Sequence, residues 1–253
     1  MFNKRWIIFI SLALIMFSIF FVSCGEKSNN LNKQNTLLTT KLVPNERYVF
    51  IKTSIYKEKD KVGEKDYVVA TISRGEKVKL IKNYEVFYQS QDGSNAPELK
   101  KISEVELTDG KKGFLSTTYL ALKPIVILEE VQAFERPDLF SRSISFLKKG
   151  SLAFIMEFAD QNWVNIYGGR RLDGSNISNV WICTNYTDDV NLVRDAIDFE
   201  DATNYLDAAS KLTDLETKNK YYKIASDILE KLAQKNSIIS QEAKLILEKI
   251  KTE

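Results

Sequence analysis

The sequence predicts an α+β chain by segregation, in which two small all-β barrels are followed by a C-terminal α-helical segment. Three observations lead to this prediction: an internal repeat with alternating apolar residues, a change to helical spacing after Asp188, and one long apolar run at the start. The 253 residues then divide into a signal peptide (1–23), a flexible tether (24–45), a first barrel (46–121), a second barrel (122–188) and two to three helices (189–253).

The start of the chain has the layout of a secretory signal. Lys4 and Arg5 form a basic region, and residues 6–22 carry no charge. Small residues after such an apolar run mark a cleavage site. We place this site after Ser23, so that Cys24 becomes the first residue of the mature chain.

Val22-Ser23-Cys24 resembles the lipobox of bacterial lipoproteins. Phe21 stands where that pattern prefers leucine, as in the relaxed boxes of spirochaetal lipoproteins. The resemblance implies that the Cys24 thiol carries a diacylglyceryl group and that acyl chains such as palmitate anchor the protein, because stable anchoring needs two or more chains. It also implies an extracytoplasmic position in the bacterial cell envelope, at the periplasmic face or the cell surface.

Two other interpretations of the apolar run stay open. Residues 6–22 could remain as an uncleaved anchor helix, although they are shorter than the roughly 20 residues that usually span a bilayer. Cys24 could also be an incidental cysteine behind an ordinary secretion signal. All three interpretations place the folded part outside the cytoplasm. Residues 25–45, rich in Ser, Asn, Lys and Thr, are predicted to be a flexible tether.

Composition excludes several classes of function. Without Lys4 and Arg5 the chain has 34 basic and 34 acidic residues, and this neutrality gives no support for nucleic-acid binding. The chain has no histidine, which excludes Ser-His-Asp and Cys-His hydrolysis and removes the commonest zinc ligand. Catalysis by two carboxylates stays open on residue count alone, as a third hypothesis, but no pair of acids lies in a recognisable active-site context. We therefore expect no catalysis, no cofactor and no metal. Cys183, which follows Trp181 and Ile182, is predicted to be a small buried hydrophobe in a strand.

An internal repeat is the most informative feature of the mature chain. The first copy contains Val69-Ala70-Thr71-Ile72-Ser73-Arg74-Gly75-Glu76-Lys77-Val78-Lys79-Leu80-Ile81, and the second contains Ser145-Phe146-Leu147-Lys148-Lys149-Gly150-Ser151-Leu152-Ala153-Phe154-Ile155. Alternating apolar residues after each glycine predict a half-buried strand. Gly75 and Gly150 are expected to supply the positive-φ turn that enters it.

The repeat extends in both directions. Upstream, Ser54-Ile55-Tyr56 parallels Gln132-Ala133-Phe134, and downstream, Gly113-Phe114-Leu115 parallels Val180-Trp181-Ile182. The pattern resembles the bacterial Src homology 3-type (SH3-like) domain, a barrel of five or six strands with a Gly-led strand and a late Gly-Trp-Ile/Val motif. The second copy lacks the glycine of that late motif, and the first has Phe in place of Trp.

Both copies carry an insertion where that family has a short hairpin. Residues 84–104 contain a turn-rich loop, and residues 167–179 contain a second, wide hairpin. Arg170 and Arg171 lie in the second insertion. They are predicted to be a solvated hairpin tip, with binding of a carboxylate or phosphate as the alternative.

Helical spacing begins after Asp188. Apolar residues recur at three- and four-residue intervals, and Thr213-Asp214-Leu215-Glu216 predicts a capping box with Thr213 at the N-cap. The stripe that contains Tyr222, Ile228, Leu229 and Leu232 is expected to pack against the second barrel or against a partner.

The sequence therefore favours a membrane-anchored binding module for peptidoglycan or an extended protein segment. Aromatic rings offer a large contact area, although strand aromatics in small barrels are usually core residues. The candidate binding residues are Tyr56, Tyr88, Phe114, Phe134, Trp163 and Trp181. The alternative is a structural or assembly lipoprotein whose C-terminal helices dock another envelope protein through an exposed apolar stripe. The expected partners are thus the membrane, through the Cys24 lipid, and peptidoglycan or an envelope protein, but no nucleic acid.

Overall fold

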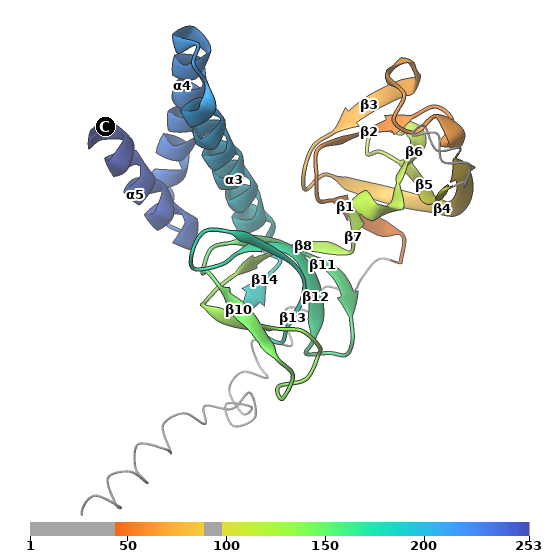
Figure 1. Ribbon diagram of the computed structural model, residues 1–253, viewed down its shortest axis with the longest axis horizontal. Coiled ribbons are helices and arrows are strands. Elements are labelled where there is room, and N and C mark those ends of the chain that lie inside the picture. Colours follow the sequence, from red (N-terminus) through yellow and green to blue (C-terminus); the bar gives the residue numbers. More distant parts are fainter. Residues whose placement is uncertain (1–43, 89–97, 253) are drawn as a thin grey trace, which may run out of the picture. The chain divides into compact units, whose positions relative to one another are not determined.

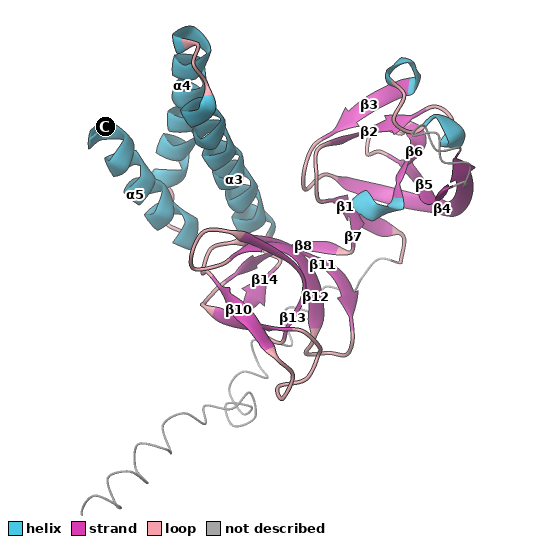
Figure 2. Ribbon diagram, viewed as in Figure 1, coloured by secondary structure: helices cyan, strands magenta, loops and turns pink. Residues whose placement is uncertain are grey.

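The computed structural model describes residues 44–88 and 98–252, which form two curled antiparallel sheets followed by three helices (Figures 1 and 2). The predicted α+β layout is confirmed at this level. The first sheet, here the first half-barrel, has the strand order β3-β2-β6-β5-β4-β1-β7. Its strands are β1 (Glu46–Val49), β2 (Thr53–Tyr56), β3 (Val68–Ile72), β4 (Lys77–Tyr88), β5 (Glu98–Glu106), β6 (Lys112–Ser116) and β7 (Leu120–Ala121).

The second sheet, here the second half-barrel, repeats this topology strand for strand. Its order is β10-β9-β13-β12-β11-β8-β14, so that β8 corresponds to β1 and β14 to β7. Its strands are β8 (Lys123–Ile127), β9 (Val131–Phe134), β10 (Ser143–Leu147), β11 (Leu152–Phe158), β12 (Val164–Arg170), β13 (Asn176–Ile182) and β14 (Tyr186–Thr187). Each sheet has seven strands because a two-residue strand, β7 or β14, pairs at one end.

The glycine of each repeat forms the same turn. Gly75 and Gly150 both have φ of 78°, as predicted from the repeat. Their amides donate to the carbonyls of Val49 and Ile127, each at 2.7 Å. Each turn meets a helix: a methyl carbon placed on Gly75 would overlap Ile197, and one on Gly150 would lie 3.4 Å from Ile239.

The insertion expected at 84–104 is mostly strand. β4 and β5 pair from Lys79 with Glu106 to Tyr88 with Glu98, and residues 89–97 lie outside the described residues. The turn-rich loop that the sequence predicts within this insertion, around Asp92 and Gly93, therefore lies outside the described residues. In the second half-barrel, β12 and β13 form the expected wide hairpin.

Each half-barrel has its own apolar core. In the first, Ile55, Ile72 and Leu115 are fully buried, and in the second Leu147 and Ile166 are fully buried. A third core joins the second half-barrel to the helices and also includes Phe50 and Ala121 from the first. The Phe50 ring lies 4.3 Å from that of Tyr167 and 6.2 Å from that of Phe154, centroid to centroid.

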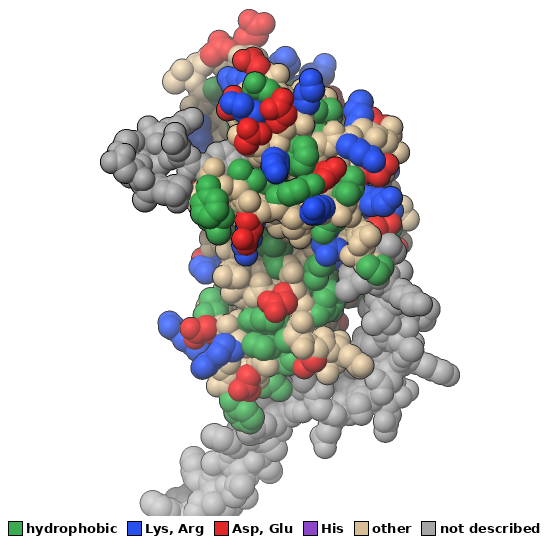
Figure 3. Space-filling model, turned by 90° about the vertical axis from the view of Figure 1, so that its right-hand side faces the viewer, with side chains coloured by type: hydrophobic (Ala, Val, Ile, Leu, Met, Phe, Trp, Pro, Cys, Tyr) green, Lys and Arg blue, Asp and Glu red, His purple; other side chains and the backbone are tan. Residues whose placement is uncertain are grey.

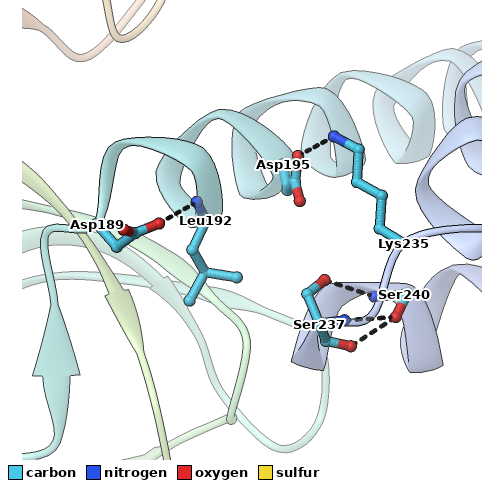
Figure 4. Close-up of polar contacts among 6 residues, drawn as sticks. All are labelled: Asp189, Leu192, Asp195, Lys235, Ser237 and Ser240. Carbon is cyan, nitrogen blue, oxygen red and sulfur yellow. Dashed lines mark hydrogen bonds and ion pairs between the residues drawn. The ribbon is translucent and has the colours of Figure 1, made fainter.

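Three helices follow: α3 (Val190–Lys211), α4 (Leu215–Ala233) and α5 (Ile238–Thr252). Asp189 begins α3 by accepting a hydrogen bond from the Leu192 amide at 2.9 Å (Figure 4). Asp214, and not Thr213, is the N-cap of α4, because its carboxylate accepts from the Thr217 amide at 2.9 Å. A carboxylate at this position also interacts favourably with the helix dipole.

α5 begins with a reciprocal cap that the sequence pattern did not predict. The Ser237 amide donates to the Ser240 hydroxyl at 3.0 Å, and the Ser240 amide donates back to the Ser237 hydroxyl at 3.3 Å (Figure 4). The same close-up shows the ion pair of Lys235 with the buried Asp195 of α3. These contacts fix the turn between α4 and α5.

The apolar stripe of α4 is covered within the chain. α3 packs against β8 and β11 and also against α4, while α5 packs against α4. Leu229 and Leu232 are consequently buried, and Tyr222 and Ile228 are half-buried. The expectation of an exposed stripe is therefore wrong for the two leucines. The helices α3 and α5, and not mainly the second half-barrel, cover them.

Candidate functional site

Three half-buried aromatic residues of the first half-barrel lie together. Tyr56 of β2 pairs in register with Phe114 of β6. The ring of Phe114 meets that of Tyr84 on β4 edge to face, with centroids 5.9 Å apart. We call Tyr56, Tyr84 and Phe114 the aromatic cluster. Sequence reasoning named two of its members and missed Tyr84.

Charged groups surround Tyr84. Its hydroxyl donates to a Glu104 carboxylate oxygen at 2.7 Å, and this hydrogen bond raises the pKa of Tyr84. The ammonium groups of Lys59 and Lys82 each lie 5.1 Å from the centre of the Tyr84 ring, within the range of cation–π attraction. The cluster thus combines apolar ring area with groups that can meet a carboxylate or a hydroxyl.

Beneath the cluster the strands are held by a polar network. The buried Ser103 hydroxyl donates to Asn83 Oδ1 at 2.7 Å and lies 2.8 Å from the Thr117 hydroxyl. These bonds join β4 and β5 to the segment after β6. They fix the positions from which Tyr84 and Phe114 project.

Tyr88 ends β4 opposite Glu98, and its side chain lies outside the described part of the chain. It is four residues beyond Tyr84, which corresponds to about 13 Å along a strand. The backbone therefore places Tyr88 further along the hairpin than the three clustered rings.

The second half-barrel contains a related group of aromatic residues that is more closed. Phe134 of β9 pairs with Trp181 of β13, as Tyr56 pairs with Phe114. The Phe134 and Trp163 rings meet edge to face at 5.4 Å. Phe134 and Trp163 are only 5% and 9% exposed, and Trp181 is half-buried. Phe134 and Trp163 are therefore core residues, and the first half-barrel holds the more accessible site.

The remaining predicted residues have different outcomes. Ser23 and Cys24 lie outside the described residues. Cys183 follows the end of β13 and is half-buried, so its predicted burial inside a strand is wrong.

The predicted solvated tip at Arg170 and Arg171 is also wrong. Both side chains are half-buried, and the Nε atoms of both are shielded from water. The guanidinium of Arg170 stacks on the ring of Phe199, 4.8 Å from its centre. No pattern in the sequence signals this contact, because Phe199 belongs to the separate helix α3.

A buried charge network is a second site that sequence reasoning missed. Arg74, from the repeat turn of the first half-barrel, forms an ion pair with Glu200 of α3 and lies over the Phe154 ring at 5.5 Å. Burial raises the pKa of Glu200 although Arg74 and Arg170 both act to lower it. The contacts join a half-barrel turn to a helix, which indicates a structural role.

The described ranges hold neither a membrane-spanning helix nor a metal-binding cluster. No helix there has the length and apolarity needed to cross a membrane. No group of three or more Cys, Asp or Glu side chains there is placed to hold a metal ion.

Comparison with known proteins identifies a family. No curated protein matches the chain. Among solved structures, NlpC2 from Trichomonas vaginalis aligns at 11% identity and a TM-score of 0.21, over 65% of this chain and 56% of that one. This chain thus spans little more than half of that protein's length. The family model described as lipoprotein LenA matches residues 11–242. The match extends over most of the sequence, and the chain therefore belongs to the lipoprotein LenA family, a family of membrane-anchored lipoproteins of the bacterial envelope.

Proposed function

We propose that this lipoprotein is a non-catalytic binding module, anchored through lipid on Cys24, with two SH3-like half-barrels. The ligand is peptidoglycan or an extended protein segment, and it binds at the aromatic cluster. The observation that carries the proposal is the set of half-buried, and so partly exposed, rings of Tyr56, Tyr84 and Phe114, with Lys59 and Lys82 beside it.

The chemistry of the cluster suits both ligand classes. Aromatic faces pack against sugar rings and against apolar side chains, and they lose little conformational entropy on binding. The lysines and Glu104 can meet the carboxylates and hydroxyls of a stem peptide or a polypeptide. Figure 3 shows basic and acidic side chains interspersed over one face of the molecule, with no single-sign field of the kind that nucleic acid requires.

Replacing Tyr84 by alanine is expected to weaken ligand binding about tenfold, because an aromatic contact contributes about 0.5–1.5 kcal/mol beyond its buried area and about 1.4 kcal/mol is a factor of ten. Pull-down on purified sacculi, and on an envelope protein extract, measures the loss and distinguishes the two ligand classes.

Tyr119→Ala provides the matched control, since Tyr119 is a tyrosine of the same half-barrel, 37% exposed, that is not part of the cluster. Unchanged binding by Tyr84→Ala, or an equal loss in both variants, would contradict the proposed site.

The anchor has its own test. Cys24→Ala is expected to abolish labelling with radioactive palmitate and to remove the globomycin-sensitive shift in precursor size, because the thiol that carries the lipid is absent. Cys183→Ala is the matched control and should remain labelled, since Cys183 is the second cysteine of the sequence. Persistent lipid on Cys24→Ala would exclude this residue as the lipidation site.

The assembly alternative retains less support. Leu215 of α4 and Leu245 of α5 are 67% and 55% exposed, but the central leucines of the α4 stripe are buried. A docking surface on the helices would therefore rest on separate leucines and not on a continuous stripe. Because the helices offer no continuous apolar surface, we place the binding function on the aromatic cluster of the first half-barrel.

A further inference from the structure

The turn between β9 and β10 exposes two large apolar side chains. Residues 135–142 form this turn, and within it Phe140 is 99% exposed and Leu139 is 49% exposed. Single exposed hydrophobes are common on protein surfaces and need no explanation. Here two adjacent ones occupy a hairpin tip, where neither the core nor a helix covers the phenyl ring.

The backbone of this turn is held by hydrogen bonds. The Phe140 amide donates to Asp138 Oδ1 at 2.9 Å, and the Ser141 amide donates to the Asp138 carbonyl at 3.0 Å. The Arg136 amide donates to the Ser141 hydroxyl at 3.0 Å, and the Glu135 amide donates to the Arg142 carbonyl at 3.0 Å. The exposed pair is thus presented by an ordered turn, which lowers the entropy cost of binding.

Further apolar side chains continue from the tip along the edge strand β10. Ile144 and Phe146, two residues apart and so on one face of the strand, are 38% and 43% exposed. Leu147 bridges to Arg171, which brings Leu172, 57% exposed, to the position opposite Phe146. Arg136 and Arg142 are exposed at the two ends of the turn.

We infer that the turn 135–142 is a membrane-contact loop, which inserts Leu139 and Phe140 among the lipids of the bilayer that carries the anchor. Arg136 and Arg142 then lie at the depth of the phosphate groups, where guanidinium ions form charge-assisted hydrogen bonds. Phenylalanine and leucine are among the side chains that interfacial segments bury at the boundary between headgroups and acyl chains.

A lipid surface fits these observations better than a protein surface. The apolar pair is at a convex tip, which a fluid bilayer can surround without a preformed pocket. The chain belongs to a membrane-anchored family. From Cys24 to Pro44 the chain can extend at most about 70 Å, so a lipid on Cys24 keeps the fold close to the bilayer.

A second copy fits less well. Antiparallel pairing of two β10 edges is opposed because part of this edge is already used: the Lys148 amide donates to the Arg170 carbonyl at 2.7 Å, and Leu147 bridges to Arg171. The strand also carries a bulge between Ser143 and Ser145, a feature that opposes pairing at a sheet edge.

The test uses the chain from residue 24 onward with Cys24→Ser, which lacks the lipid and retains every described residue. The probe is a vesicle of phosphatidylcholine, alone or with phosphatidylglycerol, and the measurement is co-sedimentation. We expect comparable binding to both vesicles, because Glu135 and Asp138 balance the charges of Arg136 and Arg142 within the turn. We expect the partition coefficient to fall about tenfold in Phe140→Ala.

Phe87→Ala is the matched control, because Phe87 is also highly exposed, at 71%, but lies on the hairpin of the first half-barrel. It should bind vesicles like the parent. Phe140→Trp adds a direct measurement. The fluorescence of the new tryptophan should shift to shorter wavelength with vesicles and should be quenched by brominated lipid. The signal of the native tryptophans, measured in Phe140→Ala, is subtracted.

Three outcomes would overturn the inference: no vesicle binding by the parent chain, equal binding by Phe140→Ala, or added fluorescence in Phe140→Trp that brominated lipid does not quench. Binding of the loop to a protein in place of lipid would give the first of these. Vesicle binding is independent of the aromatic cluster, so Tyr84→Ala should retain it, and failure of one proposal leaves the other standing.

Discussion

Gly113→Val is expected to destabilise the first half-barrel by about 3 kcal/mol, at the upper end of the cost of overpacking a core. A methyl carbon at Gly113 would lie 2.9 Å from the Tyr56 carbonyl oxygen and 3.0 Å from Cβ of Ile55. The first of these atoms is backbone, so β2 itself must move. The same shift would displace Tyr56 from its pairing with Phe114 and should therefore weaken ligand binding as well.

The second half-barrel explains how the fold tolerates a larger residue at this point. Val180 corresponds to Gly113 in the repeat, and Ala133 of β9 corresponds to Ile55. Val180 and Ala133 are both buried. We infer that the small Ala133 leaves room for Val180 in the second copy, as Gly113 leaves room for Ile55 in the first.

A double-mutant cycle checks this explanation. Gly113→Val should lower the thermal midpoint by about 6–12 °C, at 2–4 °C per kcal/mol for a chain of this size. Ile55→Ala alone should cost about 2–5 kcal/mol through its cavity. The double variant should be less destabilised than the sum, although not fully rescued, because the Tyr56 carbonyl stays close. Strict additivity would show that the two residues do not share this space.

Local patterns predicted the repeated parts of the fold. Gly75 and Gly150 could be assigned to equivalent turns because positive φ favours glycine whatever surrounds it. The N-cap of α4 was misplaced by one residue, since Thr213 and Asp214 are both good caps and only the backbone geometry selects between them.

Contacts between distant segments could not be predicted. The sequence around Arg170 predicts an exposed hairpin tip, and only the folded structure shows that Phe199 lies beside it. Tyr84 was overlooked because the sequence places it at the start of an insertion and not within a strand. Only the pairing of β4 with β5 brings Tyr84 close to Phe114. The burial of Leu229 likewise depends on how three helices pack, which apolar spacing alone leaves open.

Among the contacts between distant segments, the network of Arg74, Arg170 and Glu200 is expected to have the largest effect on stability. Side chains of the ion pair are only 22% and 11% exposed, for Arg74 and Glu200 respectively. Burial raises the pKa of Glu200, and the two arginines offset this effect only in part. The ionised carboxylate is therefore costly in the folded state and depends on its cations.

The sign of the pH dependence follows from this direction. An acid with a raised pKa binds its proton more tightly in the folded chain than in the unfolded chain. Its stabilising contribution is complete below the ordinary glutamate pKa of 4.5 and is lost as the pH rises through the raised folded value. Burial likewise raises the pKa of Asp198 and Asp201 on the same helix, so these acids add to the pH dependence of stability. The part that Glu200 contributes is the difference in pH-dependent unfolding free energy between the parent and Glu200→Gln.

Arg74→Met is expected to cost about 2–3 kcal/mol at pH 7, which is less than the usual cost of about 3–5 kcal/mol for breaking a buried pair because Arg170 remains beside the carboxylate. Most of the loss should disappear near pH 4.5, where Glu200 takes up a proton, and in the Arg74→Met/Glu200→Gln double variant. Denaturant unfolding at both pH values measures this loss of stability.

Lys149→Met is the matched control: Lys149 is the equivalent, exposed residue of the second turn, and its loss should cost less than about 0.5 kcal/mol. A loss in Arg74→Met that is the same at both pH values would show that Arg74 acts by packing on Phe154 and not by compensating the charge of Glu200.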